Sequence, residues 1–188
     1  MTAKEAFDHV TGGGSGDFNL VIEACRFQGA YCLIGGLAVN CYVEPVYTLD
    51  ADIVIQSARL SGVGEALAEK GFVVEDFKHS LNATLPGSQL RIQFTKDSLY
   101  QPFPERAVDR EIFGILVKVA ALEDVFQGKL WAWQDHQRRP SKRMKDQADL
   151  IRICESYPTL TSLLPDELRR ILEPGYKTAT GKSKGFGH

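Results

Sequence analysis

Apolar residues change their spacing about two thirds of the way along the chain. Up to about residue 120 they form short runs and two-residue alternations, both typical of β-strands, with helix-spaced stretches between them. Strands are predicted at residues 31–34, 49–55, 72–74 and 112–119, with two more inside 81–94 around a Pro-Gly turn. Helices are predicted at residues 17–29, 37–43 and 61–70, the first with Asp17 as its N-cap. This part of the chain therefore predicts a β-sheet flanked by helices.

After residue 120 the apolar residues follow a helical period. Helices are predicted at residues 121–136 and 142–155 and within 159–172. Three segments show neither period, and we expect residues 1–16 (with T-G-G-G-S-G) to be flexible, 97–110 to be a loop and 174–188 to be a flexible tail. The predicted organisation is an α/β (α+β) core at 1–110, a C-terminal strand and helical part packed on it at 111–173, and the tail.

Composition narrows the class of protein only a little. The 188 residues are 44% hydrophobic and 24% charged, as in globular proteins, and the net charge of -2 implies no global attraction to nucleic acid. The N-terminus shows no signal-peptide pattern and no apolar run reaches the roughly 20 residues of a membrane span, so no membrane partner is expected. Cys25, Cys32, Cys41 and Cys154 form no C-x-x-C pair. Reduced thiols and a cytoplasmic location are expected.

The stretch from Leu33 to Gln56 carries the candidate chemistry. An apolar strand ends at Gly35-Gly36, where a helix begins, and backbone N–H groups there can approach phosphate because no Cβ stands in the way. Asp50 and Asp52 begin the next strand, and their two-residue spacing places both carboxylates on one face. Carboxylate oxygens and substrate phosphates are the usual ligands of Mg²⁺. The stretch therefore predicts a site for phosphate and a divalent metal, Mg²⁺ or Mn²⁺.

The pattern G-G-x-A followed by T-x-D-x-D and an apolar residue resembles the nucleotidyltransferase fold of the DNA polymerase β superfamily. The matching residues are Gly35, Gly36, Ala38, Thr48, Asp50, Asp52 and Ile53. The segments L-E-D-V-F-Q-G-K-L (122–130) and K-D-Q-A-D-L (145–150) resemble two helices of the AbiEii, or abortive-infection type IV, toxin group. The aminoglycoside and lincosamide nucleotidyltransferases are also similar.

The resemblance implies a metal-dependent transfer of a nucleoside monophosphate from an NTP to an acceptor hydroxyl. Asp50 and Asp52 would be the catalytic metal ligands, and Gly35 and Gly36 would hold the triphosphate. Lys129 would contact a phosphate or base, and Asp146 would support the nucleotide or orient Lys129. The matching positions Thr48 and Lys145 complete the nucleotide-binding set. A toxin-like protein with tRNA or other RNA as acceptor, and with a cognate antitoxin partner, is the corresponding biological expectation.

The sequence departs from the family where a third carboxylate is expected. The segment Arg91 to Phe94 matches an R-h-D-h motif (h is an apolar residue), and Gln93 stands in the place of its acid. An amide can coordinate metal through oxygen but cannot act as a base. Glu75, Asp76 and Asp97 are the other acids considered. Val46 stands where the family often has arginine. A catalytically degenerate protein that binds nucleotide, RNA or a protein partner is therefore an alternative.

A basic segment follows the first C-terminal helix. It contains Arg138, Arg139, Lys142, Arg143 and Lys145 without an acidic residue, just after Trp131 and Trp133. One interpretation is a surface for triphosphate or RNA backbone, through Arg138, Arg139, Lys142 and Arg143, with base stacking. The other is a solvated helix junction with both tryptophans in the core. A third function, modification of aminoglycoside or lincosamide antibiotics, predicts an acidic pocket for a cationic drug instead.

Overall fold

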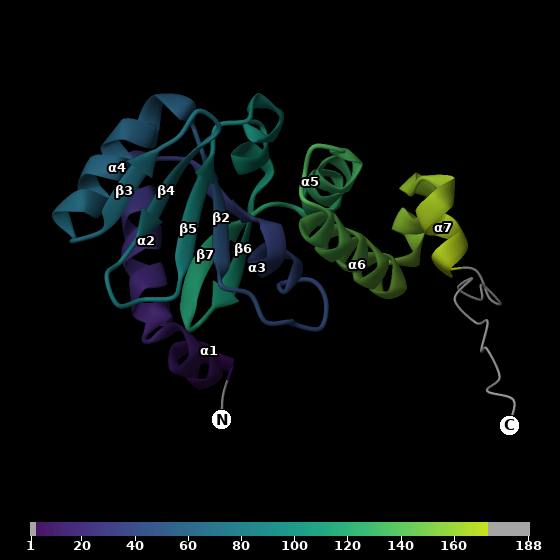
Figure 1. The fold of residues 1–188 in the computed structure, drawn as a ribbon, viewed down its shortest axis with the longest axis horizontal. Helices are drawn as coiled ribbons and strands as arrows, with labels where there is room; N and C mark the ends of the chain where they lie inside the picture. The colour runs from purple at the N-terminus through teal and green to yellow at the C-terminus, as the bar shows by residue number, and fades with distance from the viewer. Residues whose placement is uncertain (1–2, 173–188) are drawn as a thin grey trace, which may run out of the picture.

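A seven-stranded mixed sheet forms the centre of the α/β part, and a helical part extends from one side of it (Figure 1). The computed structural model describes residues 3–172. The strand order is β3-β4-β5-β2-β1-β7-β6. This architecture confirms the predicted fold class. The predicted flexible tail at 174–188 lies outside the described residues.

The strands are β1 (Tyr31–Ile34), β2 (Asp50–Ile55), β3 (Val73–Asp76), β4 (Ser80–Thr84), β5 (Arg91–Thr95), β6 (Val108–Ile112) and β7 (Ile115–Val119). The α-helices are α1 (Ala3–Thr11), α2 (Gly14–Gln28), α3 (Gly35–Val39), α4 (Leu60–Glu69), α5 (Leu122–Gln134), α6 (Pro140–Ser156) and α7 (Asp166–Leu172). Short 3-10 turns are η1 (Ser57–Arg59), η2 (Ser98–Tyr100), η3 (Phe103–Arg106) and η4 (Pro158–Leu163).

Strand β2 lies in the interior of the sheet, between β1 and β5. It pairs antiparallel with β1, where Ile34 is opposite Asp52, and parallel with β5. Its alternate residues Ala51, Ile53 and Ile55 are fully buried, as the two-residue alternation predicts. The half-buried Asp50 and Asp52 share the other face. The strand thus presents two carboxylates from the middle of the sheet.

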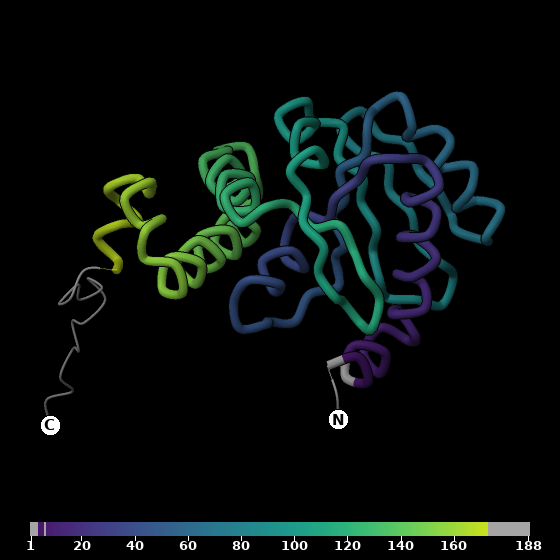
Figure 2. Tube along the Cα trace, turned by 180° about the vertical axis from the view of Figure 1, so that it is seen from behind, coloured from purple at the N-terminus to yellow at the C-terminus, as the bar shows by residue number. Residues whose placement is uncertain are grey.

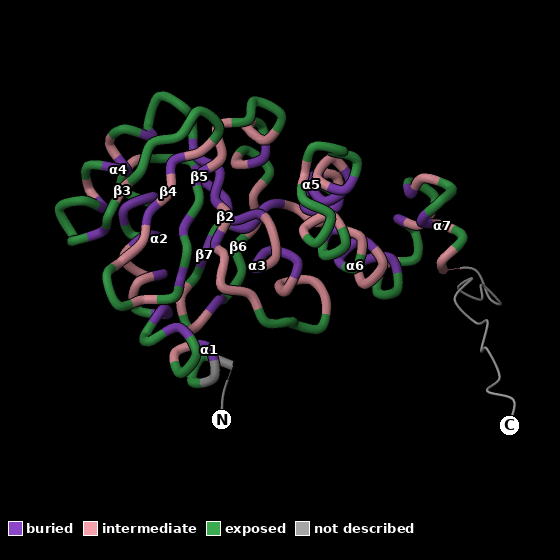
Figure 3. The backbone as a smooth tube through the Cα atoms, viewed as in Figure 1, coloured by how far each residue is buried: buried purple, intermediate pink, exposed green. Residues whose placement is uncertain are grey.

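Helices α2 and α4 pack against each other and cover the side of the sheet that faces the viewer in Figure 2. Buried positions follow the central strands and the inner faces of these helices (Figure 3). Helix α3 contacts β1 and β2, and it also contacts α5 and α6. The short α3 therefore connects the sheet to the helical part.

The expectation of a flexible segment at 1–16 is wrong for residues 3–16, which are the part of it that the structure describes. Residues 3–11 form α1, because Phe7 is buried and stacks on Phe113 with ring centroids 4.3 Å apart. The glycine run is the junction between α1 and α2, with Gly12 and Gly13 at positive φ. Helix α2 begins at Gly14, so Asp17 lies in its first turn rather than at its N-cap. The contact with Phe113 lies 106 residues away in sequence, so no local pattern could indicate it.

Residues 97–110 are more ordered than the predicted loop. They contain η2, η3 and the start of β6, which pairs antiparallel with β7 around Phe113 and Gly114. The predicted end of the core at residue 110 falls inside β6, and β7 pairs with the central β1. Residues 108–119 thus belong to the same sheet as the core, and the predicted division into 1–110 and 111–173 stays a prediction. In residues 3–172, no helix is long and apolar enough to cross a membrane.

Candidate active site

Asp50 and Asp52 line a large cleft between the sheet and the helical part. The cleft has a volume of about 940 Å³, ample for a nucleotide. It is lined by Ile34, Gly35, Asp50, Asp52 and Gln93 from the sheet side, and by Gly128, Lys129, Trp131, Arg138, Lys142 and Asp146 from the helical side. Most of the predicted site residues are therefore brought together.

Gly35 leaves the space that the Asp52 carboxylate occupies. Its φ is +69°, which L-residues rarely adopt. A Cβ at this position would lie 2.1 Å from Asp52 Oδ2, far inside van der Waals contact. Gly36 has ordinary backbone geometry, and its Cβ would lie 3.5 Å from Thr48 Oγ1. Of the two glycines, only Gly35 is therefore required to make room for the Asp52 carboxylate.

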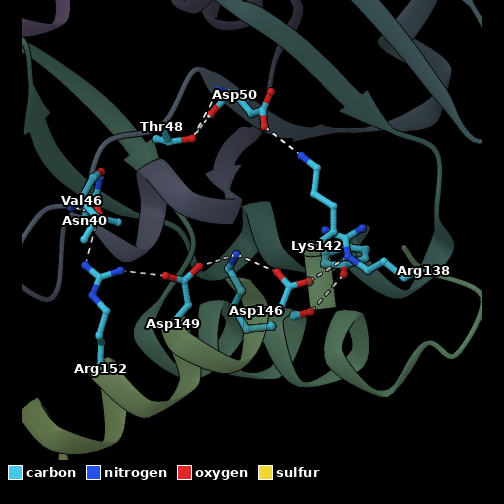
Figure 4. A network of polar contacts seen from close by, with 12 residues as sticks. Asn40, Val46, Thr48, Asp50, Arg138, Lys142, Asp146, Asp149 and Arg152 are labelled. Carbon is cyan, nitrogen blue, oxygen red and sulfur yellow. Dashed lines mark hydrogen bonds and ion pairs between the residues drawn. The ribbon is translucent and has the colours of Figure 1, made fainter. Parts of the chain in front are cut away.

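Asp50 contacts two cationic side chains. Arg91 Nε lies 2.6 Å from Oδ1, and Lys142 Nζ lies 3.0 Å from Oδ2 (Figure 4 shows Lys142 pointing at Asp50). Burial alone would raise the pKa of Asp50, but the contacts with Lys142 and Arg91 outweigh it and hold the pKa below its usual value. Asp50 is therefore ionised at neutral pH.

Asp52 has a different environment. Burial raises its pKa, and the nearby charge of Asp50 adds to this, while the positive charges of Lys129, Lys142 and Arg138 oppose it. No hydrogen bond to its carboxylate is found among the described residues, although the side chain lines the cleft. Asp52 is thus the carboxylate of the pair that has most to gain from a bound cation.

The residues fit a divalent ion that is shared with a substrate, and not one held by protein alone. Within residues 3–172, no group of three or more His, Cys, Asp or Glu side chains is arranged to hold a metal. Gln93 lies directly beside Asp52 in the β2–β5 register and lines the cleft. Asp97 caps η2 by accepting from Leu99 N (3.0 Å), and Asp76 pairs with Lys96. Two carboxylates plus phosphate oxygens suit Mg²⁺.

Lys129 bridges two aspartates of α6 in the interior of the helical part. Its Nζ lies 3.0 Å from Asp146 Oδ1 and 2.7 Å from Asp149 Oδ2, and all three residues are buried. Burial acts against the charged lysine, but the two carboxylates outweigh it and raise the pKa of Lys129. Sequence reasoning selected Lys129 and Asp146 but missed Asp149, although the i,i+3 spacing in K-D-Q-A-D-L places both aspartates on one helix face.

The network continues to the segment that precedes β2. Arg152 donates to Asp149 Oδ1 (2.7 Å), to Asn40 Oδ1 (3.5 Å) and to the Glu44 carbonyl (Figure 4). Asn40 in turn exchanges two hydrogen bonds with the backbone of Val46. The helical part is thereby tied to the residues that lead to Asp50.

The basic segment is not a free cationic surface. Arg138 pairs with Asp146 (2.8 Å), Lys142 pairs with Asp50, and Arg143 donates to the Trp133 carbonyl (2.8 Å). Only Arg139 of the four predicted RNA contacts is fully exposed. Arg138 and Lys142 line the cleft, so their charges face the candidate site rather than an outer surface.

Three members of the predicted nucleotide-binding set, Gly36, Thr48 and Lys145, do not line the cleft. Thr48 Oγ1 accepts from Asp50 N (3.2 Å) and so orders the start of β2. Lys145 is exposed on α6. Their contact with nucleotide stays a prediction.

An aromatic cluster forms another wall of the cleft. Trp131 stacks on Phe103 with centroids 5.9 Å apart, and Tyr100 meets both rings edge to face. All three residues line the cleft. Trp133 is buried, as the core interpretation predicts. Sequence reasoning missed Tyr100 and Phe103, because they come from the segment that was predicted to be an irregular loop.

Solved nucleotidyltransferases share this fold. The solution structure of the antibiotic-resistance factor ANT(2'')-Ia has a TM-score of 0.55 and 14% identity, over 82% of this chain and 88% of that chain. Its crystal structure in complex with adenylyl-2''-tobramycin has a TM-score of 0.55 and 15% identity, over 83% of this chain and 97% of that chain. An antigenic nucleotidyltransferase-like protein from Paracoccidioides brasiliensis has a TM-score of 0.49 and 19% identity, over 82% of this chain and 84% of that chain. At these identities the first two show the nucleotidyltransferase fold alone.

The family is shown by sequence. Residues 23–180 match the family described as Nucleotidyl transferase AbiEii toxin, Type IV TA system. This chain belongs to that family, which confirms the resemblance found in its motifs. No match was found among curated proteins.

Proposed function

We propose that this protein transfers a nucleoside monophosphate from an NTP to an acceptor hydroxyl, with RNA such as tRNA as the acceptor. The observation that carries the proposal is the carboxylate pair Asp50 and Asp52 in a cleft lined by Lys129, Arg138 and Lys142, with Asp52 packed against Gly35. Carboxylates facing cationic side chains suit a substrate that brings both a divalent ion and a triphosphate.

In this transfer reaction the protein forms no covalent bond with the nucleotide. The acceptor oxygen bonds to the α-phosphorus, the bond to the bridging oxygen breaks, pyrophosphate leaves with the electron pair, and the hydroxyl proton passes to water. Mg²⁺ or Mn²⁺ held by Asp50 and Asp52 would neutralise charge on the phosphates. Arg138 and Lys142 add positive charge at the cleft wall, and the aromatic wall offers rings to a nucleobase.

An anionic acceptor is favoured over a cationic drug. Lys78, His79 and Lys96 line the cleft on the side where β4 begins and β5 ends. Lys78 and His79 are exposed. The lysines at this end, of which Lys96 also pairs with Asp76, suit a phosphate backbone better than a cationic aminoglycoside. An antitoxin partner and a cytoplasmic location complete the proposal, the first from family membership and the second from four free thiols without a disulfide among the described residues.

The test is incubation of the protein with each labelled NTP, Mg²⁺ or Mn²⁺, and total tRNA, with tobramycin and lincomycin as separate acceptors. Label is expected in tRNA, and loss of at least about 100-fold is expected in Asp50→Asn and Asp52→Asn, the size of removing a preorganised charge. Label in a drug and not in tRNA would contradict the RNA acceptor.

The second candidate is a degenerate nucleotidyltransferase that only binds its ligands. Gln93 favours it, because the amide beside Asp52 cannot act as a base. Nucleotide binding without transfer to any acceptor, in the same experiment, would support this candidate and contradict the enzyme.

A further inference from the structure

Both oxygens of Asp50 are already held by positive charges of the protein. Arg91 contacts Oδ1 from the neighbouring strand β5, where it lies directly opposite Asp50 in the register. Lys142 contacts Oδ2 from the first turn of α6, 92 residues away in sequence. Each oxygen keeps a free lone pair for a metal ion, but the two cations beside it repel that ion and weaken its binding.

The charge balance of the site differs from one built for two divalent ions. Asp50 and Asp52 carry two negative charges, and Arg91 and Lys142 carry two positive charges. The third position next to Asp52 is the neutral Gln93. Two metals are stabilised by carboxylates that bridge or flank them, and within residues 3–172 no third acidic or histidine ligand is close enough. The protein has one fewer carboxylate and one more lysine than such a site needs.

Lys142 and Arg91 are not equivalent in this respect. Arg91 extends from β5 with a side chain 61% exposed, and it does not line the cleft. Lys142 extends from α6 on a flexible stem, with a side chain 37% exposed, and it lines the cleft. It also lies in the first turn of α6, which contains no acidic residue of its own, where the helix dipole favours a nearby anion. The Lys142 ammonium can therefore leave Asp50 and pair with a phosphate group bound in the cleft.

We propose that Lys142 takes the place of a second divalent ion at this site. One divalent ion enters with the nucleotide on Asp50 and Asp52, and the Lys142 ammonium supplies the other positive charge to the triphosphate. The inference rests on the proposed function, because it concerns the same nucleotide site.

The test counts bound ions directly. Mn²⁺ binding is titrated by electron paramagnetic resonance in the presence of a saturating α,β-methylene NTP analogue, and analogue binding is measured separately by calorimetry. The wild-type protein is expected to bind one Mn²⁺ per chain. Lys142→Met is expected to bind the first ion at least about threefold more tightly, since an ion-pair competitor is removed, and to bind the analogue more weakly. Gln93→Asp is expected to take up a second Mn²⁺.

The controls separate charge from folding. Lys142→Arg keeps the positive charge and is expected to keep one Mn²⁺, and Lys70→Met, at an exposed position outside the cleft, is expected to match wild type. Two Mn²⁺ of similar affinity in the wild type, or an unchanged Mn²⁺ affinity in a folded Lys142→Met, would overturn the inference while leaving nucleotidyl transfer standing. Failure of the wild type to bind the analogue at all would overturn the proposed function and the inference together.

Discussion

The absence of a side chain at Gly35 makes room for the carboxylate of Asp52 in the candidate site. Its positive φ and the 2.1 Å approach of a Cβ to Asp52 Oδ2 both exclude other residues. Gly35→Ala is expected to destabilise the protein by about 1–3 kcal/mol, from a strained backbone and a displaced carboxylate. It is also expected to abolish labelled transfer to RNA. Thermal unfolding and the transfer assay measure the two effects.

Gly36→Ala is the matched control for stability. A Cβ there meets Thr48 Oγ1 at 3.5 Å, an ordinary contact, on a helical backbone. Its free energy of unfolding is expected to stay within about 0.5 kcal/mol of wild type. Equal losses of stability in the two variants would show that space for Asp52 is not what requires glycine at position 35.

Cys41 gives a pH prediction that is independent of the active site. Burial raises the pKa of its thiol to about 11, with partial opposition from Arg110. At pH 8 only about one thiol in a thousand is therefore the reactive thiolate. Alkylation of Cys41 by iodoacetamide, followed by mass spectrometry, is expected to be slow at pH 8 and to accelerate about tenfold per pH unit up to about pH 11. A rate that levels off near pH 9 in the folded protein would contradict the raised pKa.

At the scale of elements, Arg152 joins α6 to the segment between α3 and β2. It reaches Asp149, Asn40 and the Glu44 carbonyl from one guanidinium. Arg152→Met keeps the stem but removes these bonds, so a loss of about 1–3 kcal/mol in the free energy of unfolding by urea is expected. Faster proteolysis of residues 44–48 is expected to accompany it.

Arg170→Met is the comparison for that variant. Arg170 is exposed on α7, and a change within about 0.5 kcal/mol is expected. If Arg152→Met is as stable as Arg170→Met and its 44–48 segment is equally resistant to protease, Arg152 does not hold that segment in place.

At the scale of the whole molecule, the buried charges of Lys129, Asp146 and Asp149 bind α5 to α6. Lys129→Met leaves two buried carboxylates short of a partner, and a cost of about 3–5 kcal/mol is expected. Asp146→Asn in the same chain is expected to recover part of this loss. A double-mutant cycle by urea unfolding measures the coupling. Strictly additive costs would show that the lysine and Asp146 do not act as a pair.

The sequence by itself predicted most of the strands and helices, and it showed which two carboxylates share a strand face. The alternation in 49–55 fixed which face Asp50 and Asp52 share, because side chains alternate along any strand. The helical period of 121–136 and 142–155 placed α5 and α6 within a few residues of their observed ends. The family resemblance implied that Gln93 stands in the place of a third acid, and the structure places it beside Asp52 in the β2–β5 register.

Only the tertiary structure decided what these residues face. The helix α1 forms through a contact between Phe7 and Phe113, and Lys142 meets Asp50 across 92 residues, so no local period encodes either contact. A run of basic residues has the same pattern whether it faces solvent, RNA or a carboxylate in a cleft. Its partners depend on how α6 packs beside β2. The packing places Arg138 and Lys142 of this segment beside carboxylates in the cleft, because electrostatic partners are set by distance in space and not in sequence, and RNA binding by the segment stays a prediction.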